Sequence, residues 1–241
     1  MSTSRTALRE SRFAAALLLL GLATSAARAQ TPAVQLQVRD EQHHHMKMDT
    51  GKYRVYEVLL EGGDAMLFHE HKADNVAVIL SLSDITNEVE NGQKTDVSLK
   101  PGLVSFAAAS TAKPYVHRIL LRGGAPFRNV TIELLQPLVP TPAGDSPEPV
   151  DPALAMLRES PRGRAYRLNL EPDQAARLPS RASDVFVVCL SDGSVVQRTP
   201  GQPDTTWGCS FGDYRLLAQP REAVLKNEGT KRVELVVIAL Q

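Results

Sequence analysis

The sequence predicts an all-β protein made of two tandem antiparallel barrels. Three observations carry this prediction. Short runs rich in β-branched and aromatic residues recur along the chain, pairs of turn-forming residues separate them, and the pattern of the first half returns in the second half. Short strands at regular spacing with turn signals between them are typical of β-sandwiches and barrels.

Residues 1–29 have the three-part layout of a secretory signal. Arg5, Arg9 and Arg12 precede an apolar run over 13–27, and Ala27-Arg28-Ala29 offers a small-x-small cleavage site. The run is shorter than the ~20 residues that a transmembrane helix needs. We therefore expect cleavage after Ala29, a periplasmic or secreted product, and no membrane attachment afterwards.

The charge balance argues against nucleic-acid binding. The whole chain has a formal net charge of zero. Loss of the leader would remove more arginines than acidic residues and leave a mildly acidic protein. Such a protein is a poor ligand for phosphate backbones or anionic membranes.

The first half, residues 30–135, is expected to form one barrel. Its expected strands lie at residues 53–60, 76–82, 85–90, 95–99, 116–121 and 127–135. Turn pairs stand between them, and one of these, Asn91-Gly92, suits a two-residue hairpin turn. The proline-rich segment 136–152 is then predicted to be a stiff linker. We expect a short helix near 153–159, at the start of the second barrel, which spans 153–241.

An internal repeat supports the second barrel. A shift of 110 positions places Tyr56 on Tyr166, Asp74 on Asp184 and Leu80 on Leu190, and no gap is needed between 56 and 81. Self-similarity at a fixed period indicates a repeated structural unit.

Three histidines of the first half form a candidate metal site. His69 and His71 are two residues apart on an expected strand, so both imidazoles point to the same side. His117 lies on a later strand, and barrel closure could bring it opposite the pair. Asp74 could add a carboxylate. Imidazoles in such numbers are typical of a divalent transition-metal site.

These residues resemble the cupin motifs. Gly63, five further residues and His69-x-His71 match the first motif, and His117, after Pro101-Gly102, resembles the histidine of the second. The resemblance implies two cupin-type barrels of the double-stranded β-helix or jelly-roll kind, similar to the small-barrel quercetin-dioxygenase type, with the metal inside. It covers 53–135 directly and 166–240 only through the repeat.

The sequence departs from these motifs at several positions. The usual glutamate four or five residues after the second histidine is replaced by Asn75 or Val76, and residues 107–110 lack the usual Pro-x-Gly. The asparagine that usually follows the last histidine is replaced by Leu121. The expected ligands are therefore His69, His71 and His117, alone or with Asp74.

The second barrel is expected to be degenerate and free of metal. The shift of 110 places His69 on Pro179 and His71 on Arg181, and no histidine follows His117 in the sequence. This barrel would serve in packing, in covering the site or in forming a homodimer.

Two further clusters leave alternatives open. His43-His44-His45 is either an exposed segment that binds metal adventitiously or a cover for the barrel mouth. Cys189 and Cys209 either form a disulfide, which an exported protein can keep, or remain two unpaired cysteines.

The resemblance implies a metal-dependent dioxygenase, isomerase or decarboxylase that acts on a small molecule with Fe, Mn, Ni, Cu or Zn. Glu133 is a candidate general base. The alternatives are a non-catalytic module that binds a small ligand or the metal, and a structural domain whose histidines are incidental. The chain has no phosphate-binding glycine loop, nucleotide fingerprint or nucleophile–base pair, which argues against kinases, dehydrogenases and serine hydrolases.

Overall fold

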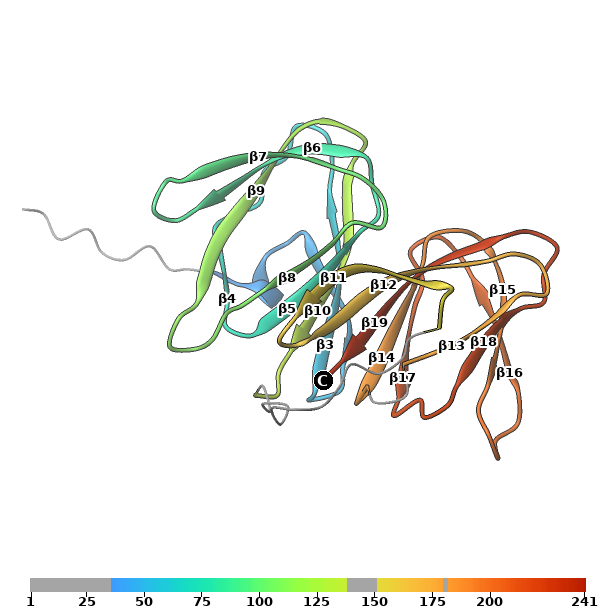
Figure 1. Cartoon of the computed structure of the whole chain (residues 1–241). Helices are drawn as coiled ribbons and strands as arrows, with labels where there is room; N and C mark the ends of the chain where they lie inside the picture. The colour runs from blue at the N-terminus through green and yellow to red at the C-terminus, as the bar shows by residue number, and fades with distance from the viewer. Residues whose placement is uncertain (1–35, 138–150, 180–181) are drawn as a thin grey trace, which may run out of the picture. The chain divides into compact units, whose positions relative to one another are not determined.

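The computed structural model describes residues 36–137, 151–179 and 182–241. The predicted leader and most of the predicted linker lie outside these residues. The described chain is built from β-strands with one short 3-10 helix, η1 (Val38–Asp40), so the all-β prediction is confirmed (Figure 1). Within the described ranges, no helix has the length and hydropathy that a membrane span requires.

Two five-stranded sheets make the first barrel. One sheet has the order β1-β4-β9-β6-β7 and the other β2-β3-β10-β5-β8. The strands of the first sheet are β1 (Leu36–Gln37), β4 (His69–His71), β9 (Tyr115–Gly124), β6 (Ser83–Val89) and β7 (Lys94–Leu99). Those of the second are β2 (His44–Asp49), β3 (Tyr53–Leu60), β10 (Phe127–Leu134), β5 (Asp74–Ile79) and β8 (Val104–Ala107).

The second half repeats this architecture. Its sheets have the orders β11-β12-β19-β14-β17 and β13-β18-β15-β16. Their strands are β11 (Leu154–Ser160), β12 (Gly163–Leu170), β13 (Ala175–Arg177), β14 (Asp184–Cys189), β15 (Gly193–Arg198), β16 (Thr205–Cys209), β17 (Tyr214–Ala218), β18 (Val224–Asn227) and β19 (Val233–Leu240). The bounds of β12 and β14 are those of β3 and β5 moved by 110 positions. The predicted repeat and the two tandem barrels are therefore confirmed.

The helix expected near 153–159 is wrong, because this segment forms strand β11 at the edge of a sheet. Its side chains are almost all exposed after Leu154, so burial imposes no alternation of polar and apolar residues. The segment is rich in Ala, Met, Leu, Arg and Glu, which favour helices intrinsically. Pairing with β12 overrides that preference.

Three apolar cores hold the compact unit Val34–Gln241 together. One lies within the first barrel and includes Val58, Leu60 and Ile119. Another fills the second barrel and includes Trp207. The third joins the halves, because the outward side chains of β3, β5 and β10 pack against those of β12, β14 and β19. The central strands of these two sheets are therefore buried on both faces, whereas the edge strands β2 and β11 are largely exposed.

Reciprocal polar contacts accompany this third core. Asp184 accepts hydrogen bonds from Lys52 and from the Tyr53 hydroxyl, the latter at 2.7 Å. In the other direction, the Asp74 carboxylate lies 3.3 Å from the Arg162 guanidinium. Asp74 and Asp184 are equivalent under the repeat, and so are Lys52 and Arg162.

Cys189 and Cys209 form a disulfide, with their Cα atoms 5.7 Å apart. Cys189 ends β14 and Cys209 ends β16, so the bond joins the two sheets of the second barrel. Both cysteines are buried.

Candidate metal centre

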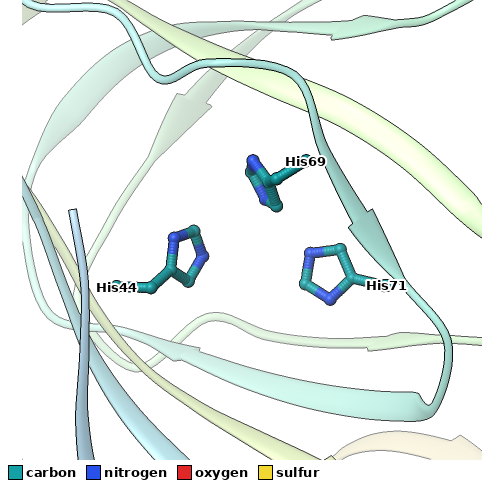
Figure 2. Close-up of side chains that lie close together, drawn as sticks. All are labelled: His44, His69 and His71. Carbon is teal, nitrogen blue, oxygen red and sulfur yellow. The ribbon is translucent and has the colours of Figure 1, made fainter. Parts of the chain in front are cut away.

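Four histidines converge inside the first barrel. His69 and His71 come from β4 and His117 from the adjacent β9, where it lies directly opposite His69. His44 opens β2 in the facing sheet. Strand alternation turns His69 and His71 inwards and Glu70 away. Figure 2 shows His44, His69 and His71 around a common space.

The spacing of their nitrogens suits a single metal ion. One nitrogen from each of His44, His69 and His71 lies within 4.8 Å of the other two. The Nε2 atoms of His71 and His117 are 3.1 Å apart. Two imidazoles bound to one ion at about 2.0–2.1 Å place their nitrogens roughly 3 Å apart. The His69 ring also lies 4.6 Å from the His117 ring, centroid to centroid.

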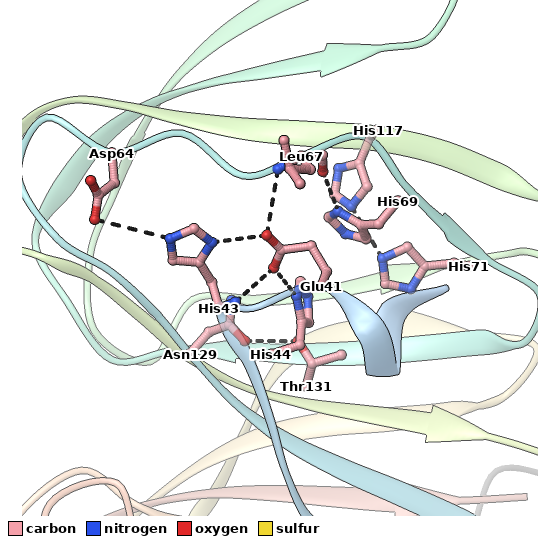
Figure 3. Close-up of polar contacts among 10 residues, drawn as sticks. All are labelled: Glu41, His43, His44, Asp64, Leu67, His69, His71, His117, Asn129 and Thr131. Carbon is pink, nitrogen blue, oxygen red and sulfur yellow. Dashed lines mark hydrogen bonds and ion pairs between the residues drawn. The ribbon is translucent and has the colours of Figure 1, made fainter. Parts of the chain in front are cut away.

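Partners outside the cluster fix the orientation of three rings, and Figure 3 shows those of His44 and His69. The Nδ1 atoms of His44, His69 and His117 lie 2.8 Å from Glu41 Oε2, 3.0 Å from the Leu67 carbonyl and 2.7 Å from Asn87 Oδ1, respectively. Each of these partners is an oxygen acceptor, so Nδ1 carries the proton. The Nε2 lone pair is then directed to the centre, as metal-binding histidines require.

Glu41 is a buried anion beside the cluster. Its carboxylate accepts hydrogen bonds from the rings of His43 and His44, both at 2.8 Å, and from the His43 amide at 2.9 Å. Burial acts to raise the pKa of Glu41, but the hydrogen bonds from His44 and His43 outweigh it and lower the pKa to about 2. Glu41 therefore remains ionised at neutral pH.

Three of these histidines, His69, His71 and His117, are held neutral. Burial, together with the neighbouring His44, lowers the pKa of His69 to about 4. Burial and the adjacent imidazoles also hold the pKa values of His71 and His117 well below the ordinary range. Neutral imidazole is the form that binds metals.

One atom gives a direct test of whether a metal fits. His69 Nε2 is buried and has no hydrogen-bond partner. A buried nitrogen lone pair without a partner is costly, so it calls for an explanation. A metal ion coordinated by His69 and its neighbours would satisfy it. The four-nitrogen donor set is also suited to a divalent transition metal.

The structure brings together three of the four predicted ligands and leaves Asp74 apart. Asp74 begins β5, where it accepts a hydrogen bond from the Ala109 amide at 3.0 Å and pairs with Arg162. Alternation along β5 turns the next residue, Asn75, to the interior instead. The Asn75 amide nitrogen lies 3.4 Å from His71 Nδ1, beside the cluster.

His44 and Glu41 are the site residues that sequence reasoning did not select. His44 is buried, whereas His45 is exposed. The sequence pattern Glu41-x-His43-His44 could have indicated them, because it places a carboxylate within three residues of two imidazoles. A carboxylate beside a histidine is typical of histidines that are held in one orientation.

The barrel interior next to the cluster is polar. Tyr56 and Glu133 point inwards from β3 and β10, and the tyrosine hydroxyl donates a hydrogen bond to Glu133 at 3.1 Å. Glu133 is buried, and this burial raises its pKa despite the opposing effects of Tyr56 and Arg54. The predicted candidate base is therefore a carboxyl group that favours its protonated form more than usual.

In the described part of the second barrel, no comparable cluster of metal ligands is found. Its interior is occupied by apolar side chains. Pro179, the counterpart of His69, is buried, and Arg181, the counterpart of His71, lies outside the described residues. The interior of this barrel thus differs in chemistry from that of the first.

Two tandem barrels of this topology have the two-barrel cupin fold, and one of them contains a histidine cluster. Solved structures carry the same fold at low sequence identity. AerE from Microcystis aeruginosa matches with a TM-score of 0.60 and 10% identity, over 83% of this chain and 93% of that one. The bacterial pirin YhhW from Escherichia coli, solved with nickel(II), matches with a TM-score of 0.55 and 14% identity, over 82% and 90%.

Oxalate decarboxylase OxdC from Bacillus subtilis, solved as a mutant, matches with a TM-score of 0.54 and 11% identity, over 82% of this chain and 75% of that one. No protein-family model and no curated protein sequence matches this chain. The likeness is therefore one of fold, and the predicted cupin resemblance holds at that level.

Proposed function

We propose that the first barrel binds a divalent transition metal through His69, His71 and His117, with His44 as a fourth imidazole, and acts on a small molecule. The observation that carries this proposal is the buried Nε2 of His69, which has no hydrogen-bond partner although its ring packs against the imidazoles of His44, His71 and His117. A bound metal would supply a Lewis acid to polarise a substrate oxygen.

The chain's own residues would prepare that site. Glu41 fixes the tautomer of His44, and Asn87 fixes that of His117. Tyr56 and Glu133 form a hydrogen-bonded pair that can hold or release a proton at Glu133 Oε2. The cupin resemblance and these groups favour a dioxygenase, isomerase or decarboxylase, with iron, manganese, nickel, copper or zinc as the candidate metals.

A non-catalytic module that binds the metal is the second candidate, and His44 favours it. Four imidazoles fill the coordination of a tetrahedral ion such as zinc, and closed sites of this kind are structural. A metal that accepts six ligands would keep positions open for substrate. The identity of the metal that the purified protein carries therefore separates the two candidates.

Metal content tests the site directly. Wild-type protein and the double variant His69→Ala, His71→Ala are purified in parallel, and bound metals are quantified by mass spectrometry. The exposed His45 of β2 supplies the matched control, His45→Ala. We expect near-stoichiometric metal in wild type and in the control and little in the double variant. Equal metal in all three would contradict the proposal.

Turnover tests the hypothesis of an enzyme. Protein loaded with each candidate metal is screened for oxygen uptake with catechols, flavonols and 1,3-diketones, and for decarboxylation by carbon dioxide release. Activity that is lost in the double variant supports an enzyme. A metal-loaded protein that is inactive on all of these substrates would favour the binding module.

We also propose that the chain acts outside the cytoplasm, as its leader predicts. The Cys189–Cys209 disulfide supports this, because such bonds persist in oxidising compartments. Cell fractionation of the natural host, with the N-terminus of the mature chain determined by mass spectrometry, tests both the location and the cleavage after Ala29. A cytoplasmic protein that still carries residues 1–29 would contradict this proposal.

A further inference from the structure

A pocket opens at the end of the first barrel near the histidines. Its volume is about 320 Å³, which is within the range of small-molecule sites. Its lining includes the basic residues Arg39, Arg54 and Lys72, the acidic residues Glu70 and Glu133, and Tyr56. Acidic and basic side chains are therefore mixed around this pocket.

Arg54 is the basic group best placed to receive a ligand. It lies on β3 and points to the interior, and its side chain is 31% exposed. Its Nε donates to Asp49 Oδ2 at 2.8 Å, which fixes the guanidinium. Its Nη1 lies 3.8 Å from Glu133 Oε2, beyond hydrogen-bonding distance. The outer N–H groups are thus held in position without a hydrogen-bonded carboxylate partner in the described chain.

The other charges around Arg54 are either engaged or weak competitors. Lys72 pairs with Glu70 at 2.9 Å, and Glu70 also accepts a hydrogen bond from Gln37 at 2.7 Å. Glu133 already accepts the Tyr56 hydroxyl, and burial raises its pKa.

Tyr56, which lines the pocket, also lies beside His44 of the histidine cluster. The Tyr56 ring lies 6.0 Å from the His44 ring, centroid to centroid. Glu133 lies opposite Asn75 in the β10–β5 ladder, and the Asn75 amide lies 3.4 Å from His71 Nδ1. Only one layer of side chains would therefore separate a molecule bound at Arg54 from the imidazoles.

We propose that this pocket binds the carboxylate of a small monoanionic molecule, with Arg54 as the anchoring residue. The proposal rests on the proposed function, because it assigns the substrate class of the same barrel interior. A guanidinium fork matches the two oxygens of a carboxylate. The carboxylates of Asp49, Glu70 and Glu133 around Arg54 disfavour a phosphate dianion relative to a monoanion.

Ligand-observed NMR titration of metal-free protein tests the proposal, with acetate and benzoate as probes. Acetamide and benzamide are their neutral counterparts of the same shape, and inorganic phosphate is the competing anion. We expect at least one carboxylate to bind and its amide not to bind. Equal binding of acid and amide, no binding of either carboxylate, or displacement by equimolar phosphate would overturn the proposal.

Variants localise the binding. Arg54→Gln should weaken it by about tenfold or more, since a hydrogen bond to a charged group is lost. Arg118, whose side chain is 32% exposed and pairs with Glu88, supplies the matched control Arg118→Gln. Arg54→Lys keeps the charge and should retain part of the affinity. Glu133→Gln should bind at least as tightly as wild type. Unchanged affinity in a folded Arg54→Gln protein would contradict the assignment.

The metal and the anion are measured separately, so each can fail alone. A protein that takes up metal through its histidines but does not distinguish benzoate from benzamide keeps the proposed function and loses this inference. A protein that binds benzoate at Arg54 but takes up no metal keeps the anion site and loses the proposed metal-binding function.

Discussion

Glu41 shows how one side chain can organise an entire site. It is buried, which acts to raise its pKa, yet its pKa is lowered because the rings of His44 and His43 and the His43 amide donate hydrogen bonds to it. The Leu67 amide contributes the more distant contact, at 3.4 Å. Glu41 thus connects the segment before β2 with the loop before β4, and it aims His44 at the other histidines.

Replacing Glu41 should weaken metal binding without removing any ligand. Glu41→Gln keeps the shape but loses the charge that favours the Nδ1–H form of His44. Loss of such a partner typically lowers metal affinity about 10–100-fold. Competition with a chelator for zinc(II) and nickel(II) measures the effect. Glu57→Gln, at a half-exposed position on β3, is the control, and equal affinities would refute the role of Glu41.

The ligands that depend on local geometry could be predicted from the sequence. The ligand that depends on long-range packing was missed. His69 and His71 share a strand face by simple alternation, and the Gly63 spacing pointed to them. His44 is buried where β2 pairs with β3, whereas the sequence left open whether 43–45 is an exposed segment or a cover for the barrel mouth. Asp74 was favoured for its charge, but β5 begins at Asp74, so alternation gives the interior place to Asn75.

At the scale of elements, strands buried on one or both faces were predictable and the exposed edge strand was not. The predicted 53–60 has the bounds of β3, whereas β11 carries no alternating pattern because solvent covers its side chains. The packing of a sheet of the first half against a sheet of the second depends on contacts between residues far apart in the sequence. The sequence pattern indicates this packing only through the repeat.

The disulfide should stabilise the second barrel. It closes a loop with a sequence separation of 20 residues, and cross-links of this size contribute about 3 kcal/mol. We expect the double variant Cys189→Ala, Cys209→Ala to lower the free energy of unfolding in urea by about that amount. Reduced wild type should match the variant. A wild type whose stability is insensitive to dithiothreitol would contradict this.

At the scale of the whole molecule, Asp184 links the two halves. It is buried, and it accepts hydrogen bonds from Lys52, Tyr53 and the Gln219 amide. Burial acts to raise the pKa of Asp184, but these hydrogen bonds outweigh it, and the pKa falls below its ordinary value of 3.8. The ionised form of Asp184 is therefore more favourable in the folded protein than in the unfolded chain.

Asp184→Asn should lower the free energy of unfolding by about 1–3 kcal/mol at neutral pH. A carboxyl group whose pKa is lower in the folded protein stabilises the fold at pH values above its unfolded-state pKa. This stabilisation is lost as the pH falls through its folded-state pKa. The difference between wild type and variant should thus stay constant above about pH 5 and shrink below pH 3.8. Urea denaturation across this range measures it, with Asp192→Asn, at an exposed position, as the control. A difference that grows in acid would contradict the assignment.

Neither half should fold stably alone. The outer faces of β3, β5 and β10 carry Val55, Val78 and Ile132, which are buried only against the second half. A chain of residues 30–137 would expose them, and large apolar patches promote aggregation. We expect this fragment to be insoluble or oligomeric by size-exclusion chromatography, and to be recovered when co-expressed with 151–241. A monomeric, folded fragment would contradict this expectation.

The reciprocal contacts of Asp74 with Arg162 and of Asp184 with Lys52 have a consequence for symmetry. Equivalent residues exchange equivalent contacts, which is the rule of an isologous two-fold interface. The chain makes these contacts within itself, and the side chains that pack between the halves are buried. We therefore expect any homodimer to use a different surface.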